Sequence, residues 1–473
     1  MKRKVMGMMA ASVMATSAIT VSASAAVPAK SVTQPAAAIT NAAAVVDGMD
    51  FTLRSVAAGQ TTLVSVKDFA QAIGASVSYS KGVLTLMKDG EQVSFSIHSK
   101  TLTTADGEVE FAAAPVIVKG MLFAQWQPIA AALGLEVTEN GQISTMKLLS
   151  GVHSLPRWAG ANTAVVAHEN EDGSVSDYLI NLTDKYSVSL MLDAEADSVS
   201  VSPDGKWGIY AASNGNLFTV NLHSGEVKKI SEDTESKSDL IWSQDGKKVF
   251  YIGGADTKYN TIYSVNLADG KLTKVVEDKV DYKSDLRANA DGTLLAYLVN
   301  TQNTVKSDSK DALNENAVEV DSSTAGTQIY VADAAKKDGK GLITPEKLTT
   351  TPDNKLYIDL MKDGKVIYVS VDVEGTNDKA TYKVVSRDKT VADFSKDLDV
   401  LVSTVTQDGN LVAVTVDNKI YKVEAATGTA ALLYTSDADI YEISVNAQGE
   451  ILANAGDQIV LIREGKAVKL TKE

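Results

Sequence analysis

The 473-residue sequence predicts a mostly β protein, in which a small α+β domain precedes a C-terminal β-propeller of seven blades, with six as the alternative. An Asp-Gly turn recurs with glycines at 205, 246, 292, 364 and 409, which lie 41, 46, 72 and 45 residues apart. Upstream of this repeat, a helix-glycine-strand pattern occurs twice, sixty residues apart. The recurrent turn predicts the propeller, and the duplication predicts the smaller domain.

The first 25 residues have the pattern of a secretory signal peptide. Lys2-Arg3-Lys4 precedes an apolar run from Val5 to Val21, and Ala23-Ser24-Ala25 offers a small-residue cleavage site. A membrane anchor is the alternative, although the run is short for the roughly 20 residues that a bilayer requires. Residues 26–44, mostly small and apolar with prolines, predict a flexible linker.

The composition restricts both partners and chemistry. The net charge is -15, and cleavage after residue 25 would remove three basic side chains and no acidic one. No basic stripe is available to release counterions from a phosphate backbone, which excludes nucleic acid as a partner. The chain has no cysteine, so disulfides, zinc-thiolate sites and a lipidated cysteine are excluded. An exported protein without thiols is typical of a Gram-positive surface or medium.

Residues 45–148 predict a compact α+β domain. Apolar residues at helical spacing occur in two segments, Phe69–Gly74 and Ile129–Gly134. Each segment ends at a glycine that can cap a helix. Short alternating segments follow both glycines, at 75–79 and 135–138. Two further alternating segments, 83–86 and 93–97, are separated by an Asp-Gly turn, which is a hairpin signal.

This region resembles the copper amine oxidase N-terminal-like, or stalk, domain of secreted Gram-positive proteins. Leu63-Val64-Ser65-Val66-Lys67 and Leu122-Phe123-Ala124-Gln125-Trp126 stand where that family has a Leu-Val-Pro-Leu-Arg stretch before each helix. Both copies lack the proline and the arginine of the pattern. The resemblance implies an accessory module that needs no copper, and nothing of the oxidase catalytic domain is present.

From residue 152 to residue 473, units of 40–45 residues each predict four short strands. In one unit the strands are expected at 198–202, 207–211, 217–221 and 227–230. Degenerate turns at Gly160 and Gly449 bring the count to seven units, or to six if these two share one composite blade. Tyrosines recur four or five residues after the turn glycine, and we expect them to pack blade against blade. They are Tyr210, Tyr251, Tyr297 and Tyr368.

These units resemble TolB-like and WD40-like propeller repeats, whose signature is Trp-Ser-Pro-Asp-Gly-Lys. Residues 242–247 depart from it only at Gln244, and residues 201–206 depart only at Val201. The resemblance covers about two-thirds of the chain. It specifies the fold but not the function, because this scaffold supports enzymes, receptors and assembly platforms.

Alternating strand direction sorts the connections onto two faces. The tight first–second and third–fourth turns share one face, and the longer loops share the other, including the insertion Thr301–Gln328. That insertion predicts a mobile loop, either a flap over the channel or a solvated decoration. The loop-rich face is acidic. Its candidate ligand-binding residues are Glu232, Asp233, Asp256, Tyr259, Asp281, Asp372, Asp437 and Asp439.

Two interpretations of this acidic face remain open. Convergent oxygen donors suit Ca²⁺, whereas exposed carboxylates also serve solubility alone. No Asp-x-Asp-x-Asp-Gly spacing occurs, so the sequence assigns no metal ligand and no cofactor.

Motifs for catalysis are missing from the sequence. None of the four histidines, 98, 153, 168 and 223, forms a metal-ligand pair by spacing, and no Gly-x-Ser-x-Gly elbow occurs. The sequence therefore predicts no catalytic residues and a non-enzymatic, monomeric binding protein. It would be secreted or at the cell surface or wall, without stable membrane insertion, and would bind a protein, peptide or cell-wall glycan. The alternatives are a metal-dependent lactonase-like or lyase-like propeller enzyme and an envelope sensor or scaffold.

Overall fold

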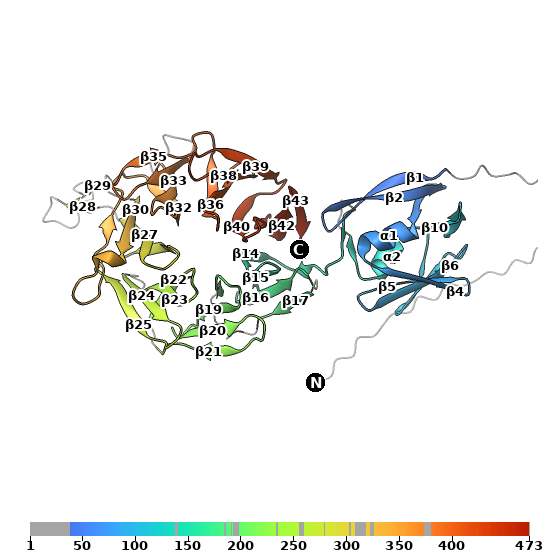
Figure 1. Cartoon of the computed structure of the whole chain (residues 1–473), viewed down its shortest axis with the longest axis horizontal. Coiled ribbons are helices and arrows are strands. Elements are labelled where there is room, and N and C mark those ends of the chain that lie inside the picture. Colours follow the sequence, from blue (N-terminus) through green and yellow to red (C-terminus); the bar gives the residue numbers. More distant parts are fainter. Residues whose placement is uncertain are drawn as a thin grey trace, which may run out of the picture.

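The computed structural model describes residues 38–137, 141–183, 186–190, 192, 198–232, 235–254, 260–278, 280–301, 304–307, 318–321, 326–372 and 380–472. A ring of small sheets lies beside a separate α+β body, and one short connection joins them (Figure 1). The expected mostly β class is confirmed. Residues 1–25 and 26–37 lie outside the described residues, so the signal peptide stays a prediction. Within the described part of the chain, no helix combines the length and apolarity needed to cross a bilayer.

Two sheets and two helices enclose one apolar core in the N-terminal domain. The seven-stranded sheet has the order β11-β12-β1-β2-β3-β10-β9, and the five-stranded sheet has the order β4 to β8. The seven-stranded sheet contains β1 (Thr40–Val46), β2 (Met49–Ala58), β3 (Thr61–Ser65), β9 (Val116–Val118), β10 (Met121–Ala124), β11 (Glu136–Val137) and β12 (Ile143–Ser144). The five-stranded sheet contains β4 (Ser76–Ser80), β5 (Val83–Lys88), β6 (Glu91–Ser96), β7 (Thr101–Thr104) and β8 (Gly107–Glu110).

The duplicated helix pattern is present as predicted. The two helices are α1 (Val66–Ile73) and α2 (Trp126–Ala132), and Gly74 and Gly134 follow with φ near +70°. The Ser65 side chain accepts a hydrogen bond from the Asp68 N–H and caps α1. The predicted linker ended too late, because Thr40–Val46 pairs along its length with β2. The alanines of this strand concealed its alternation in the sequence.

In the described part of residues 149–472, the strands form seven four-stranded antiparallel sheets, which we number 1 to 7 in chain order, beside the two-stranded pairs β13–β44 and β28–β29. Sheet 1 is β14 (His153–Trp158), β15 (Thr163–Glu169), β16 (Val175–Asn181) and β17 (Tyr186–Ser189); sheet 2 is β18 (Ser200–Val201), β19 (Trp207–Ala211), β20 (Leu217–Asn221) and β21 (Val227–Lys229); sheet 3 is β22 (Ser236–Trp242), β23 (Lys248–Gly254), β24 (Thr261–Asn266) and β25 (Leu272–Glu277); sheet 4 is β26 (Lys283–Ala288), β27 (Leu294–Thr301), β30 (Gly326–Asp333) and β31 (Glu346–Lys347). The four strands expected between 198 and 230 are all found, each shorter than or equal to its predicted range.

Sheets 5 to 7 follow without interruption. Sheet 5 is β32 (Asn354–Leu360), β33 (Val366–Val371), β34 (Thr381–Val385) and β35 (Val391–Asp393); sheet 6 is β36 (Val400–Val405), β37 (Leu411–Thr415), β38 (Lys419–Val423) and β39 (Ala430–Thr435); sheet 7 is β40 (Ile440–Val445), β41 (Ile451–Ala455), β42 (Gln458–Arg463) and β43 (Lys466–Lys469). Sheets 1 and 7 are each built from consecutive strands, so the two ends of this region share no composite sheet.

The tyrosine positions predicted to lie between blades are buried. Tyr210, Tyr251, Tyr297 and Tyr368 are each at most 1% exposed. Three of them stack on an aromatic ring of the neighbouring strand in their own sheet, such as Tyr251 on Tyr263 with centroids 5.1 Å apart. A 3₁₀ turn at Ala334–Lys336 connects β30 toward β31.

The insertion between β27 and β30 is not the plain loop that the sequence predicts. Its described residues form the antiparallel pair β28 (Thr304–Ser307) and β29 (Val318–Asp321). In the view of Figure 1 this pair lies at the outer side of the ring rather than over its centre.

Hydrogen bonds join neighbouring sheets close to the centre of the ring. Trp242 Nε1 donates to Ser200 O across sheets 3 and 2 at 2.9 Å, and Val405 N donates to Asp359 across sheets 6 and 5 at 2.6 Å. The seam between sheets 7 and 1 has two such bonds, from Trp158 Nε1 to Ser444 O and from Leu155 N to Glu442. Contacts between sheets therefore close the ring without a strand exchanged between its ends.

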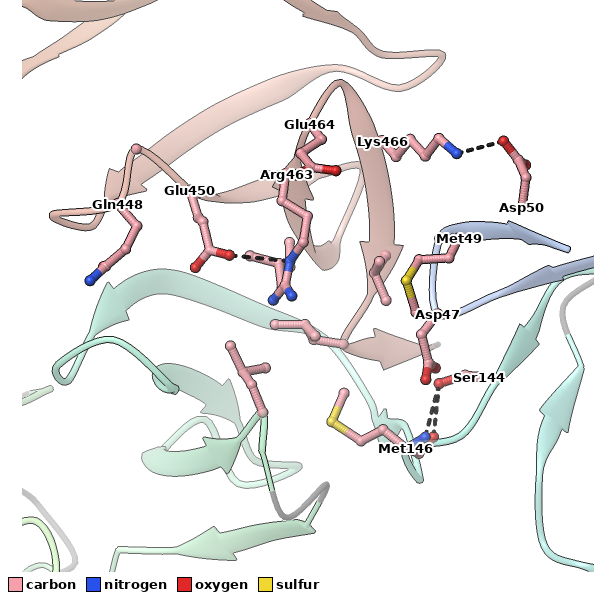
Figure 2. A pocket seen from close by; sticks show the side chains of 16 residues that line it. Asp47, Met49, Asp50, Ser144, Met146, Gln448, Glu450, Arg463, Glu464 and Lys466 are labelled. Atoms are coloured by element: carbon pink, nitrogen blue, oxygen red, sulfur yellow. Dashed lines mark hydrogen bonds and ion pairs between the residues drawn. The ribbon is translucent and has the colours of Figure 1, made fainter. Parts of the chain in front are cut away.

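The N-terminal domain joins the ring at this same seam. The strand β13 (Leu149–Ser150) pairs in parallel with the last strand, β44 (Thr471–Lys472). Lys466 forms an ion pair with Asp50, visible in Figure 2, and Lys472 forms one with Glu136 at 2.7 Å. Met146 and Leu148 pack into an apolar cluster that sheets 1 and 7 share. The two domains are thus joined by backbone pairing, by charge and by apolar burial.

The contact between sheets 1 and 2 can be tested at a turn glycine. Gly205 and Gly246 occupy the same turn position with φ of +69° and +67°, but a Cβ at 205 would lie 2.0 Å from Gly160 N, whereas at 246 it would meet nothing within 4 Å. We expect Gly246→Ala to cost the roughly 1–2 kcal/mol of a left-handed residue. Gly205→Ala should cost about 1–3 kcal/mol more in urea unfolding, because backbone must move. Equal losses would contradict this contact.

Candidate functional site

The first strands of the sheets lie toward the centre of the ring (Figure 1), and contacts join β18–β22, β22–β26, β26–β32, β32–β36, β36–β40 and β40–β14. We call the centre that these strands surround the channel. We call these seven the inner strands: β14, β18, β22, β26, β32, β36 and β40. Each begins at the loop-rich face and ends at the tight turn into the second strand of its sheet. A side chain that is exposed on an inner strand therefore faces the channel or its mouth.

Two adjacent inner strands carry the same tetrapeptide. Residues 237–240 and 283–286 both read Lys-Ser-Asp-Leu, 46 residues apart. A third lysine, Lys355, is the second residue of β32, as Lys237 is of β22, and His153 is the first residue of β14. The repeated tetrapeptide therefore places two chemical groups on each strand: the lysine is a buried cation, and the aspartate is a carboxylate at the channel.

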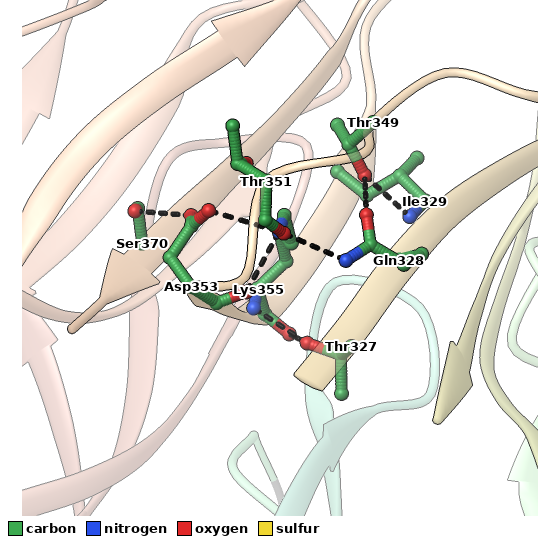
Figure 3. Close-up of polar contacts among 8 residues, drawn as sticks. All are labelled: Thr327, Gln328, Ile329, Thr349, Thr351, Asp353, Lys355 and Ser370. Atoms are coloured by element: carbon green, nitrogen blue, oxygen red, sulfur yellow. Dashed lines mark hydrogen bonds and ion pairs between the residues drawn. The ribbon is translucent and has the colours of Figure 1, made fainter. Parts of the chain in front are cut away.

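The lysine of each repeat is a structural anchor. Lys237, Lys283 and Lys355 are at most 7% exposed. Lys355 Nζ donates to Thr351 O, Asp353 O and Asp353 Oδ1 at 2.6–3.0 Å (Figure 3). Burial lowers the pKa of Lys355, and the partnership with Asp353 opposes that effect. Because the ammonium satisfies carbonyls of the connection that enters the sheet, it fixes where the inner strand begins.

The same network extends to the preceding sheet. Gln328 Nε2 donates to Thr351 O at 2.7 Å, and Thr327 Oγ1 donates to Lys355 O at 2.6 Å (Figure 3). In sheet 3, Lys237 Nζ donates to Gly215 O of sheet 2 and lies 5.5 Å from the ring centroid of Tyr251. The lysines therefore bind one sheet to the next as well as holding their own strand.

The second group of the repeat lies at a bulge. Six inner strands shift register near their start, and in four of them, β14, β22, β26 and β32, one residue within the shift has positive φ. These residues are Leu155, Asp239, Asp285 and Tyr357, with φ between +47° and +53°. Left-handed backbone is costly for residues other than glycine, by about 1–2 kcal/mol each. Strain of this kind concentrates at sites where a side chain must be held in one direction.

The two bulge carboxylates belong to one electrostatic cluster. Burial is the main cause that raises the pKa of Asp239, and the nearby Asp285 raises it further, while Leu286 N–H and Arg287 oppose the shift. Arg287 lies 3.8 Å from Asp285. In the next sheet, burial raises the pKa of Asp359, and Arg287 opposes it. Four charged side chains from sheets 3, 4 and 5 therefore interact electrostatically at the channel: Asp239, Asp285, Arg287 and Asp359.

Aromatic side chains accompany these charges. Tyr282, Tyr357 and Tyr441 are 43%, 40% and 55% exposed and lie on or directly before inner strands. Tyr441 OH donates to Asp439 at 3.1 Å. Exposed tyrosines present an apolar ring face and a polar tip together, which suits contact with partly polar ligands.

Five of the eight candidate residues predicted from the sequence are described, and they lie on connections of the loop-rich face. Asp233, Asp256 and Tyr259 lie outside the described residues. Glu232 is exposed and pairs with Lys229 at 3.0 Å, and Asp281 accepts from Asn260 Nδ2 at 3.2 Å. The half-buried Asp372 follows β33, and the exposed Asp437 and Asp439 follow β39. Among the side chains that the structure describes, no cluster of three or more His, Asp or Glu could hold a metal ion.

The residues of the channel cluster lie on inner strands, whereas the described candidate residues predicted from the sequence lie on loops. The Asp-Gly turns define the repeat, and the segments before them carry only the pattern of strands. The signal was nevertheless present, since an identical Lys-Ser-Asp-Leu occurs twice at the repeat spacing. A buried lysine and an acidic bulge were not features that strand alternation could reveal.

Comparison with known families supports the N-terminal domain. Residues 45–148 match the family described as the copper amine oxidase N-terminal domain, so that resemblance is confirmed. A comparison with curated proteins finds no match to the sequence.

The ring is similar to several solved structures of propeller type. An oligogalacturonate lyase from Vibrio parahaemolyticus is 13% identical, with a TM-score of 0.48 over 68% of this chain and 89% of its own. A Pyrococcus horikoshii acylaminoacyl peptidase is 14% identical, with a TM-score of 0.48 over 68% of this chain and 52% of its own. The tricorn protease is 12% identical, with a TM-score of 0.45 over 83% of this chain and 42% of its own. These structures are propeller-like rather than TolB-like or WD40-like in particular.

The prediction of a non-enzymatic protein is contradicted, because the similar structures are a lyase and peptidases. That prediction rested on missing local motifs. A ring brings together residues that are tens of positions apart in the chain, so a catalytic site in it need not appear as a motif within one segment. At 12–14% identity these similarities assign neither a reaction nor a substrate to this chain.

The anchoring role of the buried lysines can be measured by unfolding. Lys355→Met keeps the apolar stem but leaves the carbonyls of Thr351 and Asp353 without their cation. We expect it to lower the free energy of unfolding by about 3 kcal/mol. Lys271→Met, at an exposed lysine, is the control and should change stability by less than about 0.5 kcal/mol. Similar small losses in both variants would show that the ammonium does not anchor the strand.

The raised pKa of Asp239 predicts a pH-dependent stability. The folded state disfavours the ionised carboxylate, so the cost is present above the folded-state pKa and is lost as pH falls below the unfolded value of about 3.9. Asp239→Asn should therefore raise the melting temperature near neutral pH, with a gain that shrinks toward about pH 4. The exposed Asp269→Asn on the opposite face is the control. A gain independent of pH would contradict the electrostatic explanation.

Proposed function

We propose that the chain is exported and that its seven sheets are the blades of one closed propeller, whose channel binds a glycan rich in hydroxyl or amino groups. The turns at residues 201–206 and 242–247 support a TolB-like or WD40-like origin of the blades. The N-terminal domain would be an accessory module that contacts the cell wall or a protein partner. The protein would act as a monomer outside the cell.

One observation carries the proposal: two identical segments place Asp239 and Asp285 in strained backbone at adjacent positions of the channel. Asp239 accepts the Leu286 N–H at 3.4 Å and so also joins sheets 3 and 4, but the aspartate that repeats at position 285 is 42% exposed and pairs only loosely with Arg287, at 3.8 Å. Burial of a carboxylate beside another carboxylate is unfavourable unless a ligand repays it. A hydroxyl-rich or amino-bearing ligand would donate hydrogen bonds to both.

The charges around the channel set the kind of glycan. The inner strands carry Asp239, Asp285, Asp359 and Glu442 together with Arg157 and Arg287. Arg287 lies 3.8 Å from Asp285, and Arg157 is already paired with the buried Asp177 of β16. The excess of acid favours amino sugars over neutral sugars and neutral sugars over uronic acids, because like charges repel at close range. The exposed tyrosines would pack against the apolar faces of sugar rings.

A second candidate is catalysis on the same ligand, favoured by the raised pKa of Asp239. A carboxyl group that keeps its proton closer to neutral pH can donate that proton to a leaving oxygen. Asp285 or Arg287 would then stabilise the charge that develops nearby. This candidate requires the same channel and differs from binding alone only in its product.

The binding proposal is tested by thermal shift and titration with glucosamine, glucose and galacturonate oligomers. A ligand that binds the native state selectively raises its melting temperature. We expect glucosamine oligomers to bind most tightly, glucose oligomers less tightly and galacturonate oligomers least tightly. Asp285→Asn and Tyr357→Ala should each weaken the best ligand about tenfold, which corresponds to about 1.4 kcal/mol.

Asp269→Asn, on the opposite face, is the control for this series and should leave affinity unchanged. No shift with any oligomer, or a shift that both channel variants retain, would refute the channel as a glycan site. If the protein also cleaves a bound oligomer, Asp239→Asn should abolish the cleavage, so that no new oligomer ends form, while the oligomer still binds.

A further inference from the structure

A second cavity lies outside the channel, between the N-terminal domain and sheet 7. It has a volume of about 720 Å³, which is in the usual range of small-molecule sites. One wall is the β1–β2 turn, including Met49 and Asp50, and the opposite wall is the β42–β43 turn, including Arg463 and Lys466. Neither domain alone forms this cavity.

The floor of the cavity is apolar. Met146, Leu461 and Leu470 are at most 5% exposed, and all three belong to the apolar cluster shared by sheets 1 and 7. Met49, at the opposite wall, is 58% exposed. An apolar side chain of a ligand that entered the cavity would therefore be removed from water. This burial would stabilise the complex by about 25 cal/mol per Å² of apolar surface.

The rim offers a guanidinium to a carboxylate. Arg463 meets Glu450 through Nε, 3.3 Å from Oε1. Figure 2 shows the two Nη atoms of Arg463 directed away from Glu464 and toward the middle of the cavity. A planar pair of N–H donors matches the two oxygens of a carboxylate.

The rim also offers a carboxylate to a cation. Asp47 accepts hydrogen bonds from Thr145, and Asp50 pairs with Lys466, so these two acids already have partners. Glu464 is exposed, lies in the turn with φ of +50°, and lines the same cavity. Because acids outnumber bases around the rim, a purely anionic ligand would be repelled, whereas a ligand with both charges would not.

From these observations we propose that the interdomain cavity binds a short peptide with free termini and apolar side chains. The peptide carboxylate would pair with the Nη groups of Arg463, its ammonium would lie at Glu464, and its side chains would cover Met49 above the buried floor of Met146 and Leu461. This site is separate from the channel and does not depend on the glycan proposal.

The test is calorimetric titration of the full mature chain with the dipeptide Leu-Leu. Three analogues each remove one feature: Leu-Leu amide has no carboxylate, N-acetyl-Leu-Leu has no ammonium, and Gly-Gly has no apolar side chain. We expect Leu-Leu to bind at least tenfold more tightly than each analogue. Glucosamine oligomers should not displace it, which separates this site from the channel.

Arg463→Gln should weaken Leu-Leu about tenfold and should erase the preference for Leu-Leu over its amide. The side chains of Arg463 and Arg54 are 47% and 44% exposed, so Arg54→Gln is a matched control that removes the same charge elsewhere. Arg54→Gln should leave both affinities unchanged. Absence of Leu-Leu binding, or equal binding of Leu-Leu and its amide by the unmutated chain, would overturn the proposal.

Discussion

Closure of the ring between sheets 7 and 1 is the constraint on which the remaining structure depends. Because sheets 1 and 7 are each built from consecutive strands, neither of these two four-stranded sheets contains a strand from the other end of the ring. The seam is held by Trp158 and Leu155, by a shared apolar cluster, and by the parallel pair β13–β44. The channel exists only while the seam is closed, and the N-terminal domain is attached to it through the same strands. Loss of this seam would therefore open the channel and release the domain together.

The buried lysines show how polar groups can order a β structure. An ammonium without partners costs several kcal/mol to bury, which is why Lys283 and Lys355 have lowered pKa values. Each ammonium group can nevertheless be buried, because it donates hydrogen bonds to backbone carbonyls and to an aspartate. An apolar residue there could fill the space but could not satisfy those carbonyls. The lysine thus determines the start of the inner strand, and the bulge and its carboxylate follow from that start.

The sequence was sufficient for the period, the strand positions and the family of the N-terminal domain, since turns and helix caps are local signals. It predicted Trp207–Ala211 and Leu217–Asn221 to the residue. It placed the linker end too late at residue 44, because alanines in β1 carry no alternation of polarity. It did not reveal the cluster of Asp239 and Asp285, because these side chains come near each other only through the packing of sheet 3 against sheet 4 and through their bulges. Neither effect is encoded in a single segment.

Both proposed sites depend on sheet 7, and this follows from its position in the ring. Its inner strand β40 supplies Glu442 to the channel, while its outer strands β42 and β43 supply Arg463 and Lys466 to the interdomain cavity. Glu442 and the pair Arg463 and Lys466 thus lie toward opposite edges of one sheet. Leu461, on the strand β42 of that sheet, belongs to the apolar cluster that closes the ring. A ligand in the cavity would cover the outer edge of that cluster and contact the N-terminal domain at once. Since such a ligand binds only where both domains meet, it would favour the closed arrangement on which the channel depends.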